Sequence, residues 1–330
     1  VYKWAAVHFD QWYWESEVDT ASIALVRRYY NEGKLTLSEN AIGMDLSDAN
    51  LGFCLLLKSD GTGLYATKDL ELARRKFEDF AIQKNIYVVD VRQTLHFQQV
   101  FKTLERLGFP QAANCVHIPY NYVELPDGAM SSRKGNIVPL TSLVEKMEAA
   151  IKREYLHRYD GEWSTEEVNS VAHAVAVGAI KFGMLRMDTN KKIVFQMDEW
   201  LKIEGPSGPF VQYALARVKS LCNKLDSEGL LVNSEVGAQY LQTPHERQIL
   251  AQLLQFNSLV LNAAETYRPF LLCNYLYGLA QKFNSFYNES PIGQAPSVEL
   301  KTARLQLSRA VGNALERGLK LLGIPAPDRM

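Results

Sequence analysis

The sequence contains few cysteines and no long apolar run. Its 330 residues include four cysteines without the two-residue spacing of a zinc knuckle or a redox pair, namely Cys54, Cys115, Cys222 and Cys273. We therefore expect buried, reduced thiols in a cytoplasmic protein. No uninterrupted apolar run approaches the length that spans a bilayer, so we expect no membrane partner. The first residues are aromatic and charged, unlike a signal peptide, and lack an initiator methionine.

An excess of charge of either sign is also lacking. Lysine and arginine number 36 and aspartate and glutamate 37, for a formal net charge of −1. This balance argues against a whole-surface grip on nucleic acid, so any RNA contact must rely on local basic patches, shape and stacking. None of the six histidines has metal-ligand spacing. We expect no bound metal and no structural zinc.

The first part of the chain alternates predicted strands with amphipathic helices. Residues 51–57, 86–90 and 115–118 have the apolar character of buried strands. Thr67 is a candidate N-cap for a helix between the first two. The apolar stripe of that helix comprises Leu70, Ala73, Phe77 and Phe80, and that of the next helix comprises Phe97, Val100, Phe101, Leu104 and Leu107. This order favours a parallel α/β sheet, in which ligands lie at the carboxyl ends of strands.

Helical patterns dominate from about residue 143. The run 205–209, Gly-Pro-Ser-Gly-Pro, is the strongest breaker in the chain. Beyond it, four helices of a bundle are predicted at residues 211–225, 246–264, 270–287 and 303–322. We therefore expect an α/β region at 1–142, a helical connection at 143–204 and an all-α region at 205–330.

The most informative segment is residues 128–136, Gly-Ala-Met-Ser-Ser-Arg-Lys-Gly-Asn. It combines two hydroxyls, two cations and two glycines between strand-like flanks, and Ser142 with Glu145 forms a candidate capping box for the following helix. Glycines let a backbone approach an anion, and Arg133 and Lys134 could follow negative charge as it develops. From composition alone, a surface turn is an equally good interpretation.

Residues 130–136 resemble the signature loop of the arginyl branch of the class I aminoacyl-tRNA synthetases, with Ala129 and Ser132 where many relatives have lysine. The resemblance runs nearly end to end, from Phe9 to Met330. It implies a partial Rossmann-like class I catalytic domain followed by an all-α anticodon-binding bundle. It also implies catalytic roles for Arg133 and Lys134, and an ATP site that includes His96, Met130, Ser131, Ser132, Arg133 and Lys134. Magnesium would arrive with ATP as part of the substrate.

Tyr65 and Asp69 fall near one predicted helix start, and Gln93 near the next. A carboxylate in a first helical turn is commonly just a dipole partner. A carboxylate with a phenol and an amide nevertheless suits the donor fork of a guanidinium. In the resembled family, a tyrosine, an aspartate four residues later and a glutamine at the next junction read the substrate arginine. The resemblance therefore implies that Tyr65, Asp69 and Gln93 bind L-arginine.

The helical tail contains aromatic and basic residues that suit RNA recognition. Aromatic clusters in bundles are more often core, yet unstacked bases are commonly read by aromatic rings and arginine planes. The resemblance implies that Arg217, Tyr287 and Met330 approach the anticodon of arginine tRNA.

Together these features imply ATP-dependent formation of arginyl-adenylate and transfer of arginine to tRNA by a cytoplasmic monomer. The His-Ile-Gly-His motif of the class is absent from residues 1–330. We therefore expect the carboxy-terminal portion of a longer synthetase, inactive alone. A non-catalytic, synthetase-like tRNA-binding module is the alternative. A synthetase for another amino acid fits less well, because the zinc ligands of cysteinyl relatives are missing.

Overall fold

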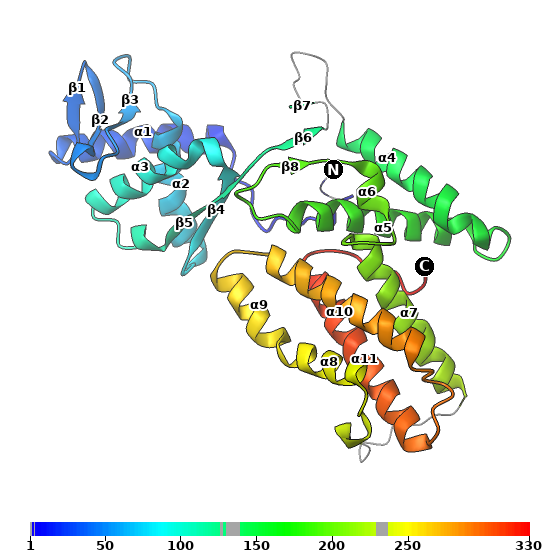
Figure 1. Ribbon diagram of the computed structural model, residues 1–330. Coiled ribbons are helices and arrows are strands. Elements are labelled where there is room, and N and C mark those ends of the chain that lie inside the picture. The colour runs from blue at the N-terminus through cyan, green and yellow to red at the C-terminus, as the bar shows by residue number, and fades with distance from the viewer. Residues whose placement is uncertain (1, 3, 126–127, 130–138, 229–236) are drawn as a thin grey trace. The chain divides into compact units, whose positions relative to one another are not determined.

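The chain packs as two compact units. The computed structural model describes residues 2, 4–125, 128–129, 139–228 and 237–330 (Figure 1). One unit is His8–Tyr122, and the other combines Val1–Val7 with Val123–Met330. This division follows packing, whereas the regions 1–142, 143–204 and 205–330 follow expected roles and remain a prediction.

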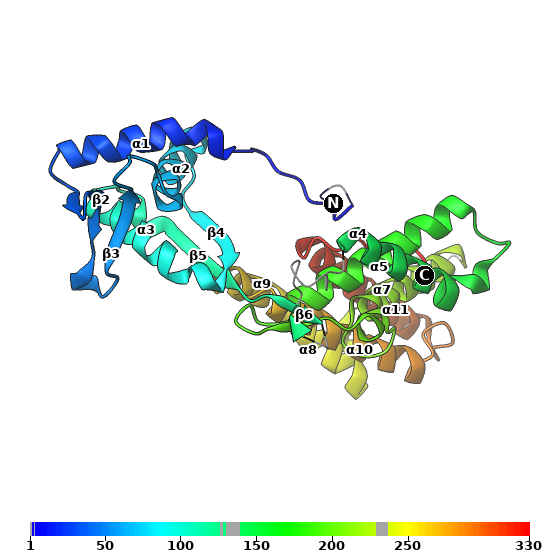
Figure 2. The ribbon, with the colours of Figure 1, turned by 90° about the horizontal axis from the view of Figure 1, so that it is seen from above.

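The first unit combines helices with two small sheets. Helix α1 packs against α2 (Figure 2). The helices are α1 (Glu15–Asn31), α2 (Tyr65–Phe80) and α3 (Thr94–Arg106), and the strands are β1 (Thr36–Ser38), β2 (Ala41–Asp45), β3 (Phe53–Leu57), β4 (Asn85–Asp90) and β5 (Cys115–Tyr120). The three strands predicted at residues 51–57, 86–90 and 115–118 are therefore present. So are the two helices predicted between them.

The predicted three-stranded parallel sheet is wrong for its first member. Strands β4 and β5 pair in parallel, from Asn85 opposite Cys115 onward, but β3 pairs antiparallel with β2 in the sheet β1-β2-β3. The physical reason is a hairpin that the sequence analysis missed. Glu39 and Asn40 between β1 and β2 have φ values of 52° and 61°, as tight hairpin turns require, and β2 supplies the backbone partners of β3.

Helix α2 begins earlier than the predicted N-cap. Leu64 is the N-cap, and Thr67 lies in the first turn. The Thr67 hydroxyl accepts a hydrogen bond from the Leu64 N–H at 3.1 Å and donates one to the Leu56 carbonyl of β3. The threonine thus stabilises the first turn of α2 from a position within the helix, not from the N-cap. Of the predicted stripe only Phe80, at the last position of the helix, is exposed, and the others are buried.

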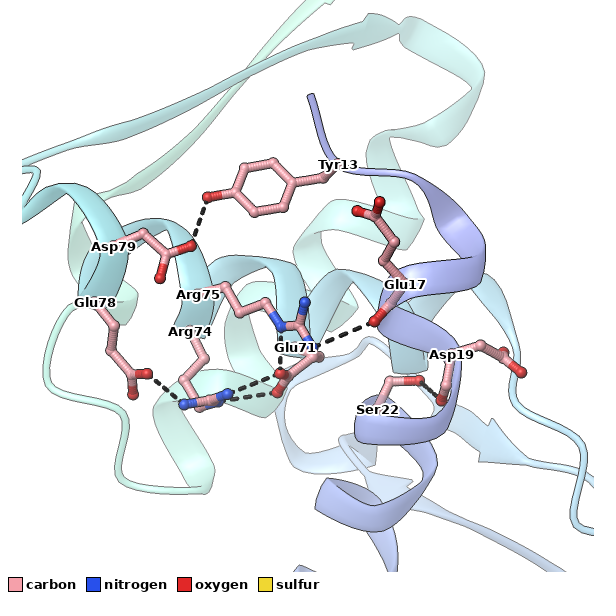
Figure 3. A network of polar contacts seen from close by, with 9 residues as sticks. All are labelled: Tyr13, Glu17, Asp19, Ser22, Glu71, Arg74, Arg75, Glu78 and Asp79. Atoms are coloured by element: carbon pink, nitrogen blue, oxygen red, sulfur yellow. Dashed lines mark hydrogen bonds and ion pairs between the residues drawn. The ribbon is translucent and has the colours of Figure 1, made fainter. Parts of the chain in front are cut away.

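A polar network joins α1 to α2 (Figure 3). The buried Glu71 carboxylate accepts hydrogen bonds from Arg74 at 2.7 and 2.9 Å and from Arg75 at 2.8 Å. Arg75 also donates to the Glu17 carbonyl of α1 at 3.3 Å. Burial opposes the Glu71 charge, but the two arginines outweigh it and lower the pKa of this carboxyl. The network fixes the helix that bears Tyr65 and Asp69.

The second unit is mainly helical. Strand β6 pairs antiparallel with β7 and in parallel with β8. The strands are β6 (Val123–Leu125), β7 (Gly128–Ala129) and β8 (Ile193–Val194), and the helices are α4 (Leu140–Ile151), α5 (Thr165–Leu185), α6 (Met197–Leu201), α7 (Gly208–Ser227), α8 (Pro244–Leu254), α9 (Phe256–Glu265), α10 (Phe270–Glu289) and α11 (Val298–Leu321).

Two expectations about these helices are wrong. Helix α4 begins after Pro139, so Ser142 and Glu145 lie within it and form no cap; proline presets the backbone φ, here −58°, ahead of the helix. The helix predicted at 246–264 is two helices that meet at Gln255, whose N–H bonds to the Gln252 carbonyl three residues back. Such a tightened turn ends α8 without glycine or proline, so no breaker residue signals it.

The predicted break at residues 205–209 is confirmed. Gly205 has φ 87°, and the Ser207 hydroxyl caps α7 by accepting the Phe210 N–H at 3.2 Å. Helices α7, α8, α10 and α11 then pack together in a bundle (Figure 1). The core of the bundle includes the fully buried Leu215, Phe283 and Phe286.

Helix α5 is long and apolar enough, by length and composition, to cross a membrane. Half of its most apolar stretch is buried inside the protein, where Val175, Ala176 and Phe182 are inaccessible. Its apolarity is therefore accounted for by packing, with α4 and α7 as neighbours.

Candidate functional site

The starts of α2 and α3 bring two predicted site residues into contact. The His96 Nε2 atom and the Asp69 Oδ2 atom lie 2.6 Å apart, in hydrogen-bond distance. Both side chains are about three-quarters buried, with exposed fractions of 24% and 23%. Within residues 8–122, the other Asp69 oxygen, Oδ1, accepts no hydrogen bond. The imidazole thus fixes the carboxylate through one oxygen and leaves the other for a ligand.

Local hydrogen bonds place the start of α3. The Asp90 carboxylate at the end of β4 accepts the Arg92 N–H at 2.9 Å, and the Thr94 hydroxyl donates to the Val91 carbonyl at 2.6 Å. These bonds form the single turn that carries Gln93 into α3. The parallel pairing of β4 with β5 holds the end of the strand from which this turn begins. The predicted strand-to-helix junction is therefore present.

Tyr65 and Gln93 lie at these two helix starts with their side chains open. Tyr65 is 75% exposed, and Gln93 is also exposed. Within residues 8–122, neither makes a side-chain hydrogen bond with Asp69 or His96. The structure thus joins Asp69 with His96, while the phenol and the amide remain available to a ligand.

Lys76 is a charged neighbour that the sequence analysis missed. Burial lowers the pKa of its ammonium, and the Asp69 charge partly opposes that shift. Its Nζ atom lies 4.9 Å from the centre of the Tyr87 ring. The signal available in the sequence was its place on the apolar stripe side of α2, one residue before Phe77.

The signature segment cannot be placed in the same way. Met130, Ser131, Ser132, Arg133 and Lys134 lie outside the described residues. The structure describes only what flanks them, β7 before and α4 after.

The predicted RNA-binding residues Arg217, Tyr287 and Met330 come together in the second unit. The Arg217 guanidinium contacts two rings, with its carbon 4.8 Å from the centre of Tyr213 and 5.1 Å from that of Tyr287. It donates hydrogen bonds to the Asn284 side chain at 2.9 Å and to the Tyr213 hydroxyl at 3.2 Å. These contacts fix the orientation of Arg217 and of the rings beside it, and aromatic rings held in this way suit stacking on a base.

Met330 lines a hollow that also includes Arg217 and Tyr287. Its carbonyl oxygen accepts hydrogen bonds from the Tyr159 hydroxyl at 3.2 Å and from Arg158 at 3.4 Å. The hollow has a volume of about 380 Å³, and its lining includes Tyr159, Trp163, Tyr213, Arg217, Tyr287, Arg329 and Met330. Tyr159, Trp163, Tyr213 and Arg329 were not predicted. The four-residue spacings of Tyr159 to Trp163 and of Tyr213 to Arg217 were the available signal.

The cysteines and the acidic residues form no metal centre in the described ranges, where no group of three or more potential ligands gathers. The four cysteines are free and buried, as predicted. Burial raises the pKa of Cys115 to about 11 and that of Cys273 to about 12, so these thiols stay protonated at neutral pH.

Comparison with known proteins connects both units to one enzyme family. Residues 20–197 match the family described as tRNA synthetases class I (R), catalytic domain, and residues 211–330 match the DALR anticodon binding domain. The arginine–tRNA ligase of Bdellovibrio bacteriovorus is 58% identical over 330 residues, which is 100% of this chain and 56% of that protein. That of Phocaeicola vulgatus is 35% identical over 332 residues, 100% of this chain and 55% of the relative.

Solved structures agree in fold. Thermus thermophilus arginyl-tRNA synthetase superposes with a TM-score of 0.83 at 28% identity, covering 99% of this chain and 61% of that one. Arginyl-tRNA synthetase from Plasmodium falciparum gives a TM-score of 0.82 over 100% of this chain and 56% of that one; at 21% identity it supports the fold alone. The chain thus spans about half the length of the curated relatives it matches.

A class I catalytic-domain match followed by a helical anticodon-binding domain defines a class I aminoacyl-tRNA synthetase chain. Within that class, the chain belongs to the arginyl-tRNA synthetase family.

Proposed function

We propose that this chain supplies the arginine-recognition residues, the signature loop and the anticodon-binding bundle of an arginine–tRNA ligase. The observation that carries the proposal is the Asp69 carboxylate, held by His96 through Oδ2 with Oδ1 open, in a chain of the arginyl family. The cytoplasmic location and monomeric state expected from the sequence belong to this proposal.

Asp69, Tyr65 and Gln93 bind the guanidinium of L-arginine. A carboxylate is the best partner for a planar fork of five donors, and a phenol and an amide supply further acceptors. The contact with His96 holds the Asp69 carboxylate in a fixed orientation. Because a site built for a guanidinium leaves buried polar groups unmatched by other amino acids, it rejects them without an editing step.

The reaction begins when the carboxylate of arginine attacks the α-phosphate of ATP, which forms arginyl-adenylate and releases pyrophosphate. The terminal ribose hydroxyl of tRNA then takes the arginyl group and AMP leaves. His96 and residues Met130, Ser131 and Ser132 contact ATP, and Arg133 and Lys134 stabilise the charge on the departing pyrophosphate. Positioning and charge stabilisation suffice, so no protein nucleophile is needed.

The second unit binds the anticodon loop of arginine tRNA. Unpaired bases stack on aromatic rings and guanidinium planes, and the hollow beside Arg217, Tyr287 and Met330 offers both. The near-neutral chain fits recognition by such a local site.

The 330 residues alone are expected to form no arginyl-adenylate, because the His-Ile-Gly-His motif is not among them. The measurement is arginine-dependent exchange of pyrophosphate into ATP by this chain. Robust exchange would contradict the assignment of ATP binding to the His-Ile-Gly-His motif and the signature loop at 130–136 acting together. A gene product that at its natural length binds arginine tRNA but transfers no arginine would favour the non-catalytic module.

The arginine site is tested by Asp69→Asn in the gene product at its natural length. Loss of a hydrogen bond to a charged group, worth about 1.5–3 kcal/mol, should raise the Michaelis constant for arginine roughly 10- to 100-fold. Asp79→Asn on the same helix is the matched control. Among the described residues Asp79 bonds only the Tyr13 hydroxyl, at 2.9 Å, so the Michaelis constant of this variant should be unchanged. An unaltered constant in Asp69→Asn would remove this carboxylate from the site.

A further inference from the structure

A column of three flat groups stands beside the Arg217 hollow. The rings of Tyr159 and Trp163 are stacked with centres 4.0 Å apart and planes 8° from parallel. The Arg329 guanidinium lies over the Trp163 ring, 4.5 Å from the ring centre. Tyr159 precedes the turn before α5, and Trp163 lies in that turn. The column therefore joins the start of α5 to residue 329.

The Arg329 guanidinium is fixed in its plane by a second contact. Its Nε and one terminal nitrogen both bond the Glu167 carboxylate. Glu167 is itself held in the first turn of α5, where its N–H donates to the Ser164 hydroxyl at 3.1 Å. The carboxylate uses the N–H edge of the guanidinium and Trp163 covers one face. The opposite face is the part left for a ligand.

The Arg329 side chain is accessible from solvent, with an exposed fraction of 57%. It borders the 380 Å³ hollow that also contains Arg217 and Tyr287, and a second hollow of about 750 Å³ whose polar lining includes Ser170, Ser220 and Asn223. Hydroxyl and amide groups of this kind are suited to hydrogen bonding the edge of a base.

We propose that Arg329, backed by Trp163 and Tyr159, is a stacking platform for an unpaired nucleobase of RNA, next to the base bound at Arg217 and Tyr287. The inference rests on the proposed RNA-binding function of this unit and extends it to a second base. Glu167 already binds Nε and one terminal nitrogen of Arg329, which leaves an acidic ligand only the outer terminal N–H groups. A nucleobase needs only the free face, because bases stack on guanidinium planes.

The decisive variant is Arg329→Lys, which keeps the charge but removes the plane. Binding of arginine tRNA to the 330-residue chain is measured by fluorescence anisotropy across a series of salt concentrations. Stacking is worth about 1–3 kcal/mol per base, so Arg329→Lys should weaken binding roughly 5- to 100-fold with an unchanged salt slope. Trp163→Leu should weaken tRNA binding by a similar factor. The variant that carries both substitutions should bind little more weakly than either single variant, because each single change already removes the same platform.

The control is Arg309→Lys, the same change at a partly exposed arginine paired with Asp226 on the bundle, which should bind like the wild type. Wild-type affinity for Arg329→Lys, together with a salt slope reduced by about one in Arg329→Gln, would overturn the proposal and identify a phosphate contact instead. If Arg217→Ala weakens binding and the Arg329 variants do not, the proposed stacking platform at Arg329 is wrong and the proposed RNA-binding function of the unit stands. If the wild-type chain binds no arginine tRNA, the proposed function of the unit fails as well.

Discussion

Among individual residues, Glu246 and Arg304 combine charge with burial most strongly in the second unit. The Arg304 Nε atom lies 2.7 Å from Glu246 Oε1, and the two side chains are 9% and 0% exposed. Glu246 Oε2 also accepts the Thr243 N–H at 2.8 Å and so completes the cap of α8. Burial opposes the Glu246 charge, but the bonds from Thr243 and Arg304 outweigh it and lower the pKa of the carboxyl.

Replacing this carboxylate should destabilise the second unit in a pH-dependent way. Glu246→Gln leaves the Arg304 charge buried without its partner, which should cost about 3–5 kcal/mol at pH 7. A lowered folded-state pKa stabilises the protein above the ordinary glutamate value of about 4.3, and that contribution is lost as pH falls through the folded-state pKa. The free-energy difference from wild type, measured by urea unfolding, should therefore shrink below about pH 4.

The matched control for this prediction is Glu299→Gln. Glu299 lies in the first turn of α11 and is exposed, so its replacement should change the free energy of unfolding little. A difference between Glu246→Gln and wild type that stays constant from pH 7 to pH 3.5 would contradict the role given to the ionised pair.

Two short motifs, through their resemblance to the arginyl family, suggest Tyr65, Asp69, Gln93 and His96 as site residues. The structure joins Asp69 with His96, and the roles of all four stay a prediction. Arg329 could not be predicted in the same way. Its neighbours Trp163 and Glu167 are far from it in sequence, so no spacing links them; tertiary packing alone brings them together.

At the scale of elements, helices α5 and α7 cross where glycines allow their backbones to come very close together. A Cβ atom on Gly208 would lie 2.3 Å from the Gly178 carbonyl oxygen, and one on Gly178 would lie 2.4 Å from the Gln212 side chain. Gln212 is fully buried and donates hydrogen bonds to the Ala174 carbonyl at 2.9 Å and the Pro325 carbonyl at 2.6 Å. The crossing therefore also holds the segment that leads to Arg329 and Met330.

Gly208→Ala should separate these helices, although alanine is the better helix former. A new methyl group against backbone cannot be relieved by rotating a side chain, so the expected cost is about 1–3 kcal/mol. Gly278→Ala within α10 is the control, because its Cβ would meet only the Gln252 side chain, at 3.3 Å. Thermal unfolding should show a lower midpoint for Gly208→Ala alone. Equal midpoints for Gly208→Ala and wild type would disprove the tight crossing.

Periodicity predicted the helices α2, α3, α7, α10 and α11 and the strands β3, β4 and β5, but it predicted neither their exact ends nor the strand partners, and α1, β1, β2 and β8 were missed. Helices α2 and α4 start earlier than their apparent caps, because Thr67 bonds from inside the helix and Pro139 supplies the preset backbone. The pairing of β3 depends on the hairpin at Glu39 and Asn40, which lacks the Asn-Gly signal of tight turns. Pairing is a tertiary property, so an alternation of strands and helices does not determine it.

For the whole molecule, the family matches follow the order of the chain but not the division into packed units. The catalytic-domain match at residues 20–197 begins in the α/β unit and extends into the second unit, and the anticodon-binding match at 211–330 covers the helical bundle. The α/β unit carries Asp69 and His96, and the helical unit carries the hollow at Arg217. Each unit has its own core, centred on residues such as Leu56 and Leu70 in one and Leu215 and Phe283 in the other. Each can therefore be tested by changes that leave the other intact.

The most direct test of the account is the affinity of this chain for arginine tRNA, compared between wild type, Arg217→Ala and Tyr287→Ala. Because each variant removes one side of a stacking site, both should bind roughly 5- to 100-fold more weakly, while Tyr240→Ala, at an exposed tyrosine elsewhere in the same unit, should bind as wild type does. Unchanged affinity in both Arg217→Ala and Tyr287→Ala would contradict the assignment of the hollow to the anticodon.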